Sequence, residues 1–430
     1  MIYIKKIKGW KRTMFERKYS IFKAVFAILI SFVLLMSPAL SRAQDHPAGA
    51  AKKQAKWTFM IFLNGVNDLY PYGPRTINQL KTIGSTEDFN IVILRGYLSK
   101  PGEKVVIRKG KVEVIEKGLK LDMGDYKELV RFAKWTHENY PADHYLIDIW
   151  NHGMGWKKQG RVSTKGISYD DNTGNHITTL QLGESMKMIK SIFGHNVDIL
   201  GMDACLMQMA EVAYELKDGV DYIVAAEEIE PGTGWPYDKF AEIPARNPRV
   251  TPKQYAAAMV EAHKEMYIPI KSEATTCSAV ECSKLGAFYS KLDELAQTLK
   301  SKIGQNDVLE TVKKVSDEVQ KFDEGDHSDL VHFCQLLISH SKDDEIKNKA
   351  EQLIQLMVSS PSKLITANGT TGESMKNAFG MAIYLPRESF DPEYRTLINF
   401  GKTAWADFIE IYAARKNAAS TSLPPAVPEN

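Results

Sequence analysis

Apolar residues recur along this chain in short blocks separated by amphipathic stretches. Continuous apolar runs of roughly four to eight residues predict buried strands, whereas apolar residues at i, i+3, i+4 and i+7 predict helices. We expect buried strands at residues 57–63, 90–94, 144–150, 197–200 and 222–226. Helices are expected between these strands, for example one that Asp125 caps and that ends near Pro141. Strands alternating with helices predict a doubly wound, mostly parallel α/β sheet flanked by helices.

Two further patterns extend this sheet. Residues 105–116 alternate around a Lys-Gly-Lys turn and predict an added β-hairpin. Beyond residue 245 the expected elements are a helix at 251–267, a strand at 275–283, helical segments at 284–354 and a late core strand at 381–385. We therefore expect an α/β core at 57–245 and a helical C-terminal subdomain at 246–415, which carries the late core strand.

The first 43 residues differ in composition from the rest. Eight lysines and arginines precede an apolar run at 24–36, and Ser41-Arg42-Ala43 is a small-x-small site. This is the pattern of a secretory signal peptide that is removed after Ala43. The alternative is an uncleaved anchor, which needs about 20 apolar residues rather than the 13 present here. We expect an exported protein, periplasmic or extracellular, with no stable membrane association after signal cleavage.

Removing this leader changes the charge of the chain. The leader carries nine basic residues and one acid, so the remaining 387 residues have a formal net charge of −6, although the whole chain has +2. A mildly acidic protein offers no polybasic surface for nucleic acid or anionic membranes. Residues 44–56 are expected to be a flexible lead-in, and residues 416–430, with three prolines, a disordered tail.

The strand at 197–200 leads directly into Asp203 and Cys205, and residues 206–213 then repeat with helical spacing. A thiol between a strand end and a helix N-terminus meets unpaired N–H groups and the positive end of the helix dipole, which favour the thiolate. Cys205 is therefore a candidate nucleophile. The alternative is a small buried apolar thiol, since most free cysteines are structural.

A second stretch supplies a partner for this thiol. The strand at 144–150 runs into Asn151, His152 and Gly153, which leaves the imidazole on an open turn. Ligands of open parallel sheets bind in the crevice outside the carboxyl ends of the strands. If the two strands are neighbours, His152 and Cys205 face each other across that crevice.

These two blocks resemble a known family. An apolar block ending in His-Gly, a spacer, and an apolar block ending in acidic-Ala-Cys form the signature of the caspase-like clan of cysteine peptidases. Here the blocks read YLIDIWNHG and VDILGMDAC, and His152 and Cys205 are 53 residues apart. The stretches NHGMGW, AAEEIEPGTGW and MAIYLP resemble the clostripain family in particular. The resemblance extends over residues 57–413 and implies a caspase-like fold for the predicted sheet.

The resemblance implies an endopeptidase with a Cys205/His152 dyad. Cys205 would attack the scissile carbonyl and form a thioester, while His152 would assist thiolate formation and protonate the leaving amine. The implied oxyanion donors are the backbone N–H groups of Gly153 and Cys205. No third catalytic residue is evident. The alternative from a different class is a degenerate family member that binds basic peptides without cleaving them.

Asp203 is the candidate determinant of specificity. It precedes Cys205 by two residues on an extended stretch, so both side chains project to the same side. The resemblance implies that this acid receives a P1 arginine or lysine, with arginine favoured by bidentate pairing. The alternative is that Asp203 caps the following helix. Glu227 and Glu228, after the next strand, either line a subsite for a basic peptide or are solvated loop acids.

The segment between residues 156 and 179 is polar and longer than an ordinary connection. Clostripain-like enzymes can cut themselves after a basic residue in this place, and the bond after Lys165 is the candidate here. A solvated charged loop is the alternative. We therefore expect either a monomer or a self-cleaved two-chain form, with protein or peptide substrates that carry Arg or Lys at P1.

Cysteine spacing also bears on metals and disulfides. Cys277 and Cys282 lie five residues apart on an expected strand and point to opposite faces, which argues against their pairing. Zinc is a rival function for His152 and Cys205, but no CxxC or HxxxH spacing supplies further ligands. Calcium is used by the protein that gives the family its name, yet no twelve-residue EF-hand loop is present. The sequence thus predicts no certain cofactor and leaves calcium open.

Overall fold

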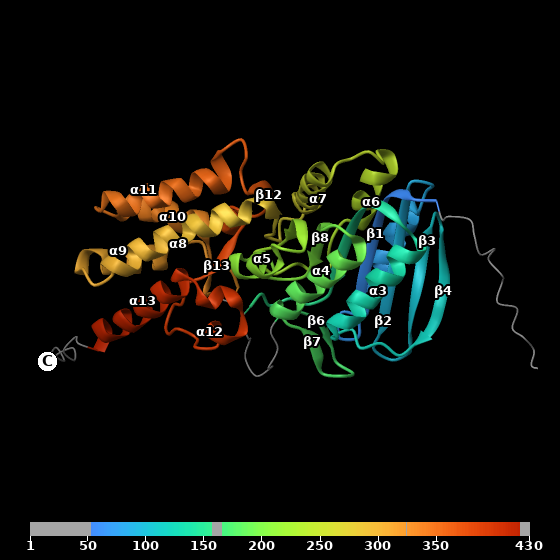
Figure 1. Cartoon of the computed structure of the whole chain (residues 1–430), viewed down its shortest axis with the longest axis horizontal. Helices are drawn as coiled ribbons and strands as arrows, with labels where there is room; N and C mark the ends of the chain where they lie inside the picture. The colour runs from blue at the N-terminus through green and yellow to red at the C-terminus, as the bar shows by residue number, and fades with distance from the viewer. Residues whose placement is uncertain (1–52, 157–165, 324, 422–430) are drawn as a thin grey trace, which may run out of the picture. The chain divides into compact units, whose positions relative to one another are not determined.

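The computed structural model describes residues 53–156, 166–323 and 325–421, in which a nine-stranded sheet has the order β12-β10-β9-β8-β5-β1-β2-β3-β4 (Figure 1). Its five central strands are parallel: β2 (Phe89–Tyr97), β1 (Ala55–Gly65), β5 (Ala142–Trp150), β8 (Val197–Asp203) and β9 (Val220–Ala225). Antiparallel strands extend both edges: β3 (Gly102–Arg108) and β4 (Lys111–Leu119) on one side, β10 (Thr276–Glu281) and β12 (Ile365–Thr370) on the other. The predicted α/β fold with an added hairpin is confirmed.

Helices cover both faces of this sheet. In β1, Phe59 and Ile61 point to one face and Met60 and Phe62 to the other, and all four are buried. The core around Phe59 contains residues of α2 (Gly73–Ile83), α6 (Tyr237–Arg246) and α7 (Pro252–Tyr267). The core around Met60 contains residues of α3 (Tyr126–Asn139), α4 (Thr179–Phe193) and α5 (Ala210–Leu216). Burial on both faces explains why the central strands read as continuous apolar runs.

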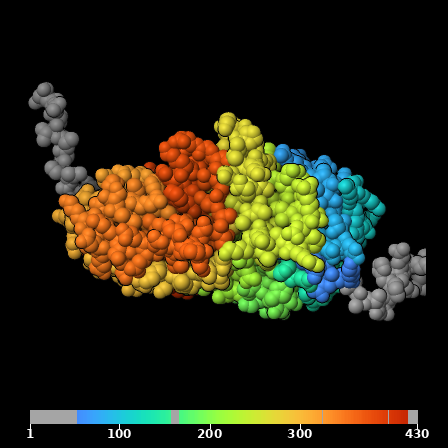
Figure 2. All heavy atoms as spheres, turned by 90° about the horizontal axis from the view of Figure 1, so that it is seen from above, coloured from blue at the N-terminus to red at the C-terminus, as the bar shows by residue number. Residues whose placement is uncertain are grey.

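The C-terminal part is a helical group. It contains α8 (Leu285–Lys302), α9 (Asn306–Glu318), α10 (Leu330–His340), α11 (Asp344–Ile354), the short α12 (Tyr394–Leu397) and α13 (Ala404–Thr421). Figure 2 shows these orange and red segments gathered at one end of the described unit and the blue N-terminal strands at the other. The helical subdomain is therefore present, although β10 and β12 from the same part of the chain belong to the main sheet.

The late strand differs from the prediction in its partner. β13 (Ala382–Tyr384) is buried, but it pairs with β11 (His327–Asp329) in a separate two-stranded sheet. The main sheet instead gains β12, which the apolar pattern does not reveal. β12 is an edge strand with several half-exposed residues, so its sequence ITANGT contains no apolar run.

Other predictions differ at the loops and the tail. Within the long connection after residue 156, β6 (Ile167–Asp170) and β7 (Asn175–Ile177) form a small antiparallel pair. The disordered tail was predicted from residue 416, which is wrong for 416–421 because α13 continues through them. The predicted signal peptide, the start of the lead-in and Lys165 lie outside the described residues. In the described ranges, every helix is too short or too polar to cross a membrane.

Candidate active site

The carboxyl ends of β5 and β8 bring His152 and Cys205 to the same place. The two strands are parallel neighbours, and Trp150 of β5 pairs with Asp203 of β8. His152 and Cys205 therefore each lie two residues beyond a matched pair, where ligands of parallel sheets bind. Both residues line one cavity of about 340 Å³, together with Asp203.

Gly153 lies directly against the Cys205 backbone. A Cβ atom on Gly153 would lie 2.5 Å from the Cys205 carbonyl oxygen and 2.9 Å from Cγ of Met207, so no side chain fits there. Gly153 also forms an antiparallel bridge with Ile167. The hydrogen bonds of this bridge run from the Met154 N–H to the Gly166 oxygen and from the Ser168 N–H to the His152 oxygen. In such a pair the central N–H points away from the partner strand. The Gly153 N–H thus stays outside this ladder, as an oxyanion donor requires.

The His152 imidazole is half-exposed and has an acidic neighbour. Its Nε2 lies 2.7 Å from Oδ1 of Asp68, which belongs to the turn after β1. The two residues are 84 positions apart, so no local sequence signal links them. The sequence does not reveal this neighbour of His152, because only the pairing of β1 with β5 brings the turn after β1 close to the imidazole.

The sulfur of Cys205 contacts the loop that follows β9. It accepts a hydrogen bond from the backbone N–H of Glu230 at 3.3 Å, and the Glu230 carbonyl oxygen lies 4.0 Å away. Burial raises the pKa of the Cys205 thiol to about 12, and the carboxylates of Glu230 and Asp203 act in the same direction. The thiol of the unliganded protein is therefore protonated at neutral pH.

The prediction of a helix N-terminus beside Cys205 is wrong. α5 begins only at Ala210, and Leu206 adopts a φ of 61° that interrupts any helix. The intervening residues bond instead to the loop after β9: Leu206 N–H donates to Glu228 O, and Gln208 N–H donates to Ala226 O. The thiol thus lacks the helix dipole that would have favoured a thiolate.

Asp203 is buried beside the cavity, with 6% of its surface exposed. Its Oδ2 accepts the Trp235 N–H at 3.3 Å and lies 2.9 Å from the Tyr237 hydroxyl, which is 2.6 Å from Oδ2 of the buried Asp148. Burial raises the pKa of Asp203 well above its usual range, and the charges of Asp148 and Glu230 add to this. The alternative of a helix cap is wrong, since residue 209 precedes α5 and no side chain caps it.

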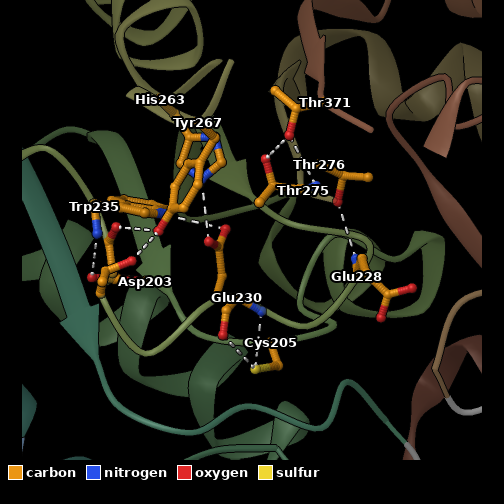
Figure 3. A network of polar contacts seen from close by, with 12 residues as sticks. Asp203, Cys205, Glu228, Glu230, Trp235, His263, Tyr267, Thr275, Thr276 and Thr371 are labelled. Carbon is orange, nitrogen blue, oxygen red and sulfur yellow. Dashed lines mark hydrogen bonds and ion pairs between the residues drawn. The ribbon is translucent and has the colours of Figure 1, made fainter. Parts of the chain in front are cut away.

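Of the three glutamates in the loop after β9, Glu230 lines the cavity, whereas Glu227 and Glu228 do not. Figure 3 shows Glu230 beside Cys205, with its carboxylate directed toward Trp235 and His263. Glu230 Oε1 accepts the indole N–H of Trp235 at 3.3 Å, and Oε2 lies 3.2 Å from Nε2 of His263.

The two predicted subsite acids have other partners. Oε2 of the buried Glu227 accepts the Gly380 N–H at 3.0 Å, and Oε1 of Glu228 accepts the N–H groups of Ile229 and Asp323. All three glutamates stand in the same stretch, AAEEIEPGTGW. Only the path of the backbone determines which of them faces the cavity, so the sequence pattern could not select Glu230.

The four cysteines are free, and Cys277, Cys282 and Cys334 are buried and do not line this cavity. Within residues 53–156, 166–323 and 325–421, no group of three or more His, Cys, Asp or Glu side chains is arranged to hold a metal ion.

A sequence model described as the clostripain family matches residues 61–412. Clostripain of Hathewaya histolytica is 33% identical over 127 residues, which are 27% of this chain and 24% of that protein. The aligned part thus spans about a quarter of that relative's length.

Solved structures share the fold at low sequence identity. A secreted C11 cysteine protease from Bacteroides thetaiotaomicron, in complex with an irreversible peptide inhibitor, superposes with a TM-score of 0.64 at 19% identity, over 81% of this chain and 99% of the other. An inactive zymogen C11 protease from Parabacteroides distasonis gives 0.60 at 19% identity, over 84% and 99%.

The chain shares its fold with these solved C11 protease structures. The family match extends over most of the chain. The chain belongs to the clostripain family.

Proposed function

We propose that this protein is an exported cysteine endopeptidase that cleaves peptide bonds after arginine and lysine. Cys205 is the nucleophile, His152 the general acid and base, and the Gly153 and Cys205 N–H groups are the oxyanion donors. The observation that carries this proposal is the cavity that the thiol and imidazole share with the buried carboxylate of Asp203.

The cavity is the S1 pocket, and its chemistry suits a cationic side chain. Three acidic residues line it, Asp203, Glu230 and Asp323. Trp150, Ile229 and Pro231 supply apolar walls for the aliphatic part of arginine or lysine. A cationic side chain opposes the burial that raises the pKa of Asp203, because its charge favours the ionised carboxylate. Losing one partner of such a buried charged pair costs about 2 to 5 kcal/mol. That corresponds to roughly a 30-fold to a few thousand-fold preference for a basic P1 residue.

The proton of the thiol determines the order of events. Because Cys205 begins as a thiol, its proton passes to His152 as sulfur attacks the scissile carbon and the carbonyl electrons move to oxygen. Collapse of this intermediate breaks the C–N bond, and the imidazolium protonates the amine that leaves. Water then attacks the thioester, His152 accepts a proton from it, and cleavage of the C–S bond regenerates the thiol.

Export and self-cleavage belong to the same proposal. The basic leader, apolar run and small-x-small site at residues 1–43 support secretion to the periplasm or the medium. The lysines and arginine at 157–165 offer bonds that an Arg- and Lys-specific peptidase can cut, with the bond after Lys165 as the candidate. The active protein is then either one chain or two chains produced by that cut.

A fluorogenic substrate assay tests the proposal. Residues 44–430 are incubated with matched peptides that carry Arg, Lys, Gln or Asp at P1, with and without a calcium chelator. We expect cleavage of the Arg and Lys peptides only, and loss of cleavage in Cys205→Ala. Asp203→Asn should reduce the preference for Arg over Gln by about 30-fold or more. Binding of the Arg peptide without turnover by the unaltered protein would instead indicate a degenerate peptide-binding protein.

A further inference from the structure

We propose that Asp68 is the positioning residue for His152, holding the ring hydrogen on Nε2 and thereby leaving Nδ1 free to accept the proton of the Cys205 thiol. This inference rests on the proposed function, because it assigns Asp68 a part in the same proton transfer. The sequence offers no candidate for such a residue. The geometry points to Asp68 through the 2.7 Å separation between its Oδ1 and Nε2 of His152.

The chemistry of the pair determines the tautomer. An ionised carboxylate only accepts hydrogen bonds, so the nitrogen that faces it must carry the hydrogen. Asp68 therefore keeps the proton of the neutral imidazole on Nε2 and leaves the lone pair on Nδ1. A lone pair on Nδ1 is what a base needs to accept the thiol proton. The carboxylate thus selects the imidazole form that the reaction requires.

The turn that carries Asp68 is fixed to the strand that carries His152. The side chain of Asn151, adjacent to His152, donates to the Asn64 carbonyl oxygen at 2.8 Å. The Asn151 Oδ1 accepts the Tyr169 N–H at 2.7 Å, and the Tyr169 carbonyl in turn accepts from the side chains of Asn64 and Asn67 at 2.8 Å. Asp68 follows Asn67 directly, so these bonds preset the position of its backbone relative to His152.

Folding does not explain the contact between Asp68 and His152. The Asp68 side chain is 78% exposed, and exposed ion pairs add little to stability. During attack by the thiol, His152 accepts a proton and becomes an imidazolium next to the Asp68 carboxylate. A bound peptide also displaces water from the cavity, which strengthens the attraction between these charges. The pair therefore stabilises the transition state more than it stabilises the folded protein.

Kinetics of substituted proteins test this role. Asp68→Asn and Asp68→Ala should reduce kcat about 10- to 100-fold, whereas KM for an Arg substrate changes by less than about twofold. Asp68→Glu should restore part of kcat because it returns the carboxylate. The matched control is Glu318→Gln, which removes a pair of the same kind, His340 Nε2 to Glu318 Oε2 at 2.7 Å, away from the cavity. We expect this control to retain full kcat.

An NMR measurement tests the same inference without turnover. In protein with ¹⁵N-labelled histidine, the His152 resonances are assigned by their loss in His152→Gln. At a pH where the imidazole is neutral, the parent should show hydrogen on Nε2, and Asp68→Ala should show a mixture of both tautomers. Unchanged kcat in Asp68→Asn and Asp68→Ala, or an unchanged tautomer in Asp68→Ala, would overturn the proposal. A parent that fails to cleave would reject the proposed function, while the tautomer would still decide the role of Asp68.

Discussion

The backbone N–H of Glu230 lies 3.3 Å from the sulfur of Cys205 in the cavity, while the Glu230 carboxylate accepts the indole N–H of Trp235. One residue thus contacts the nucleophile through its main chain and contributes a carboxylate to the proposed S1 pocket. Removing the carboxylate by substitution leaves the main-chain contact in place. The two contributions can therefore be separated experimentally.

The protonated thiol should be visible in its alkylation rate. With the pKa of Cys205 raised to about 12 by burial, the thiolate fraction rises tenfold for each pH unit between 7 and 10. Alkylation by iodoacetamide, followed by mass spectrometry of the Cys205 peptide, should show this slope with no plateau below pH 10. Cys205→Ala is the control, since the other three cysteines are buried. A plateau near neutral pH would indicate a preformed thiolate and contradict this prediction.

Glu230 and Glu228 should differ in their effect on specificity. Glu230→Gln removes a carboxylate from the cavity but keeps both the shape and the N–H to sulfur. Hydrogen bonds to charged groups contribute about 1.5 to 3 kcal/mol, so kcat/KM for Arg substrates should fall about 10-fold or more. Glu228→Gln should leave it within about twofold, because Oε1 of Glu228 accepts from backbone N–H groups and a glutamine can do the same. Equal effects of the two substitutions would contradict the assignment of Glu230 to the pocket.

Gly153 should not tolerate a methyl group. In Gly153→Ala the new Cβ would lie 2.5 Å from the Cys205 carbonyl oxygen, so the His152 turn and the Cys205 turn must separate. A displacement of about 1 Å costs on the order of 100-fold in rate, and kcat/KM should fall by at least this factor. Gly286→Ala is the control, because its Cβ would meet nothing within 4 Å. Full activity in Gly153→Ala would show that the two turns do not need this close approach.

Buried carboxyls should make folding stability fall as pH rises. Burial raises the pKa of Glu211 to about 7 from an ordinary value of 4.5, so the folded state binds this proton more tightly than the unfolded state. Its contribution is present in full below pH 4.5 and is lost as pH rises to 7, by about 3 kcal/mol. Urea unfolding at pH 5 and pH 8 should therefore show a smaller loss of unfolding free energy in Glu211→Gln than in the parent. The prediction fails if both proteins change equally.

Features that depend on buried strands could be predicted from the sequence. The apolar runs that give β1, β5 and β8 are continuous because helices cover both faces of the sheet, and such runs are readable in one dimension. Chain order then places His152 and Cys205 at strand ends. The position of Asp203 beside the cavity could be predicted in the same way, because side chains two residues apart on an extended chain project to the same side.

Features that depend on the paths of loops could not be predicted in this way. Leu206 has helical spacing with later residues, yet the chain after Cys205 bonds to the loop after β9. α5 therefore starts only at Ala210, and the thiol has no helix N-terminus beside it. Glu230 lines the cavity and Glu227 does not, and this difference depends on the backbone path of that loop. Asp68 reaches His152 through contacts between segments 84 positions apart. Tertiary hydrogen bonds outweigh local propensity at each of these positions.

The pairing of β5 with β8 has a consequence for a chain cut between residues 156 and 166. Such a cut would put the imidazole on one fragment and the sulfur on the other, while the ladder from Leu146–Ile199 to Trp150–Asp203 would still join them. Because this seam lies in the middle of the sheet and is buried on both sides, the fragments should co-elute as one particle in gel filtration. They should come apart only in denaturant, and either piece expressed by itself should be inactive.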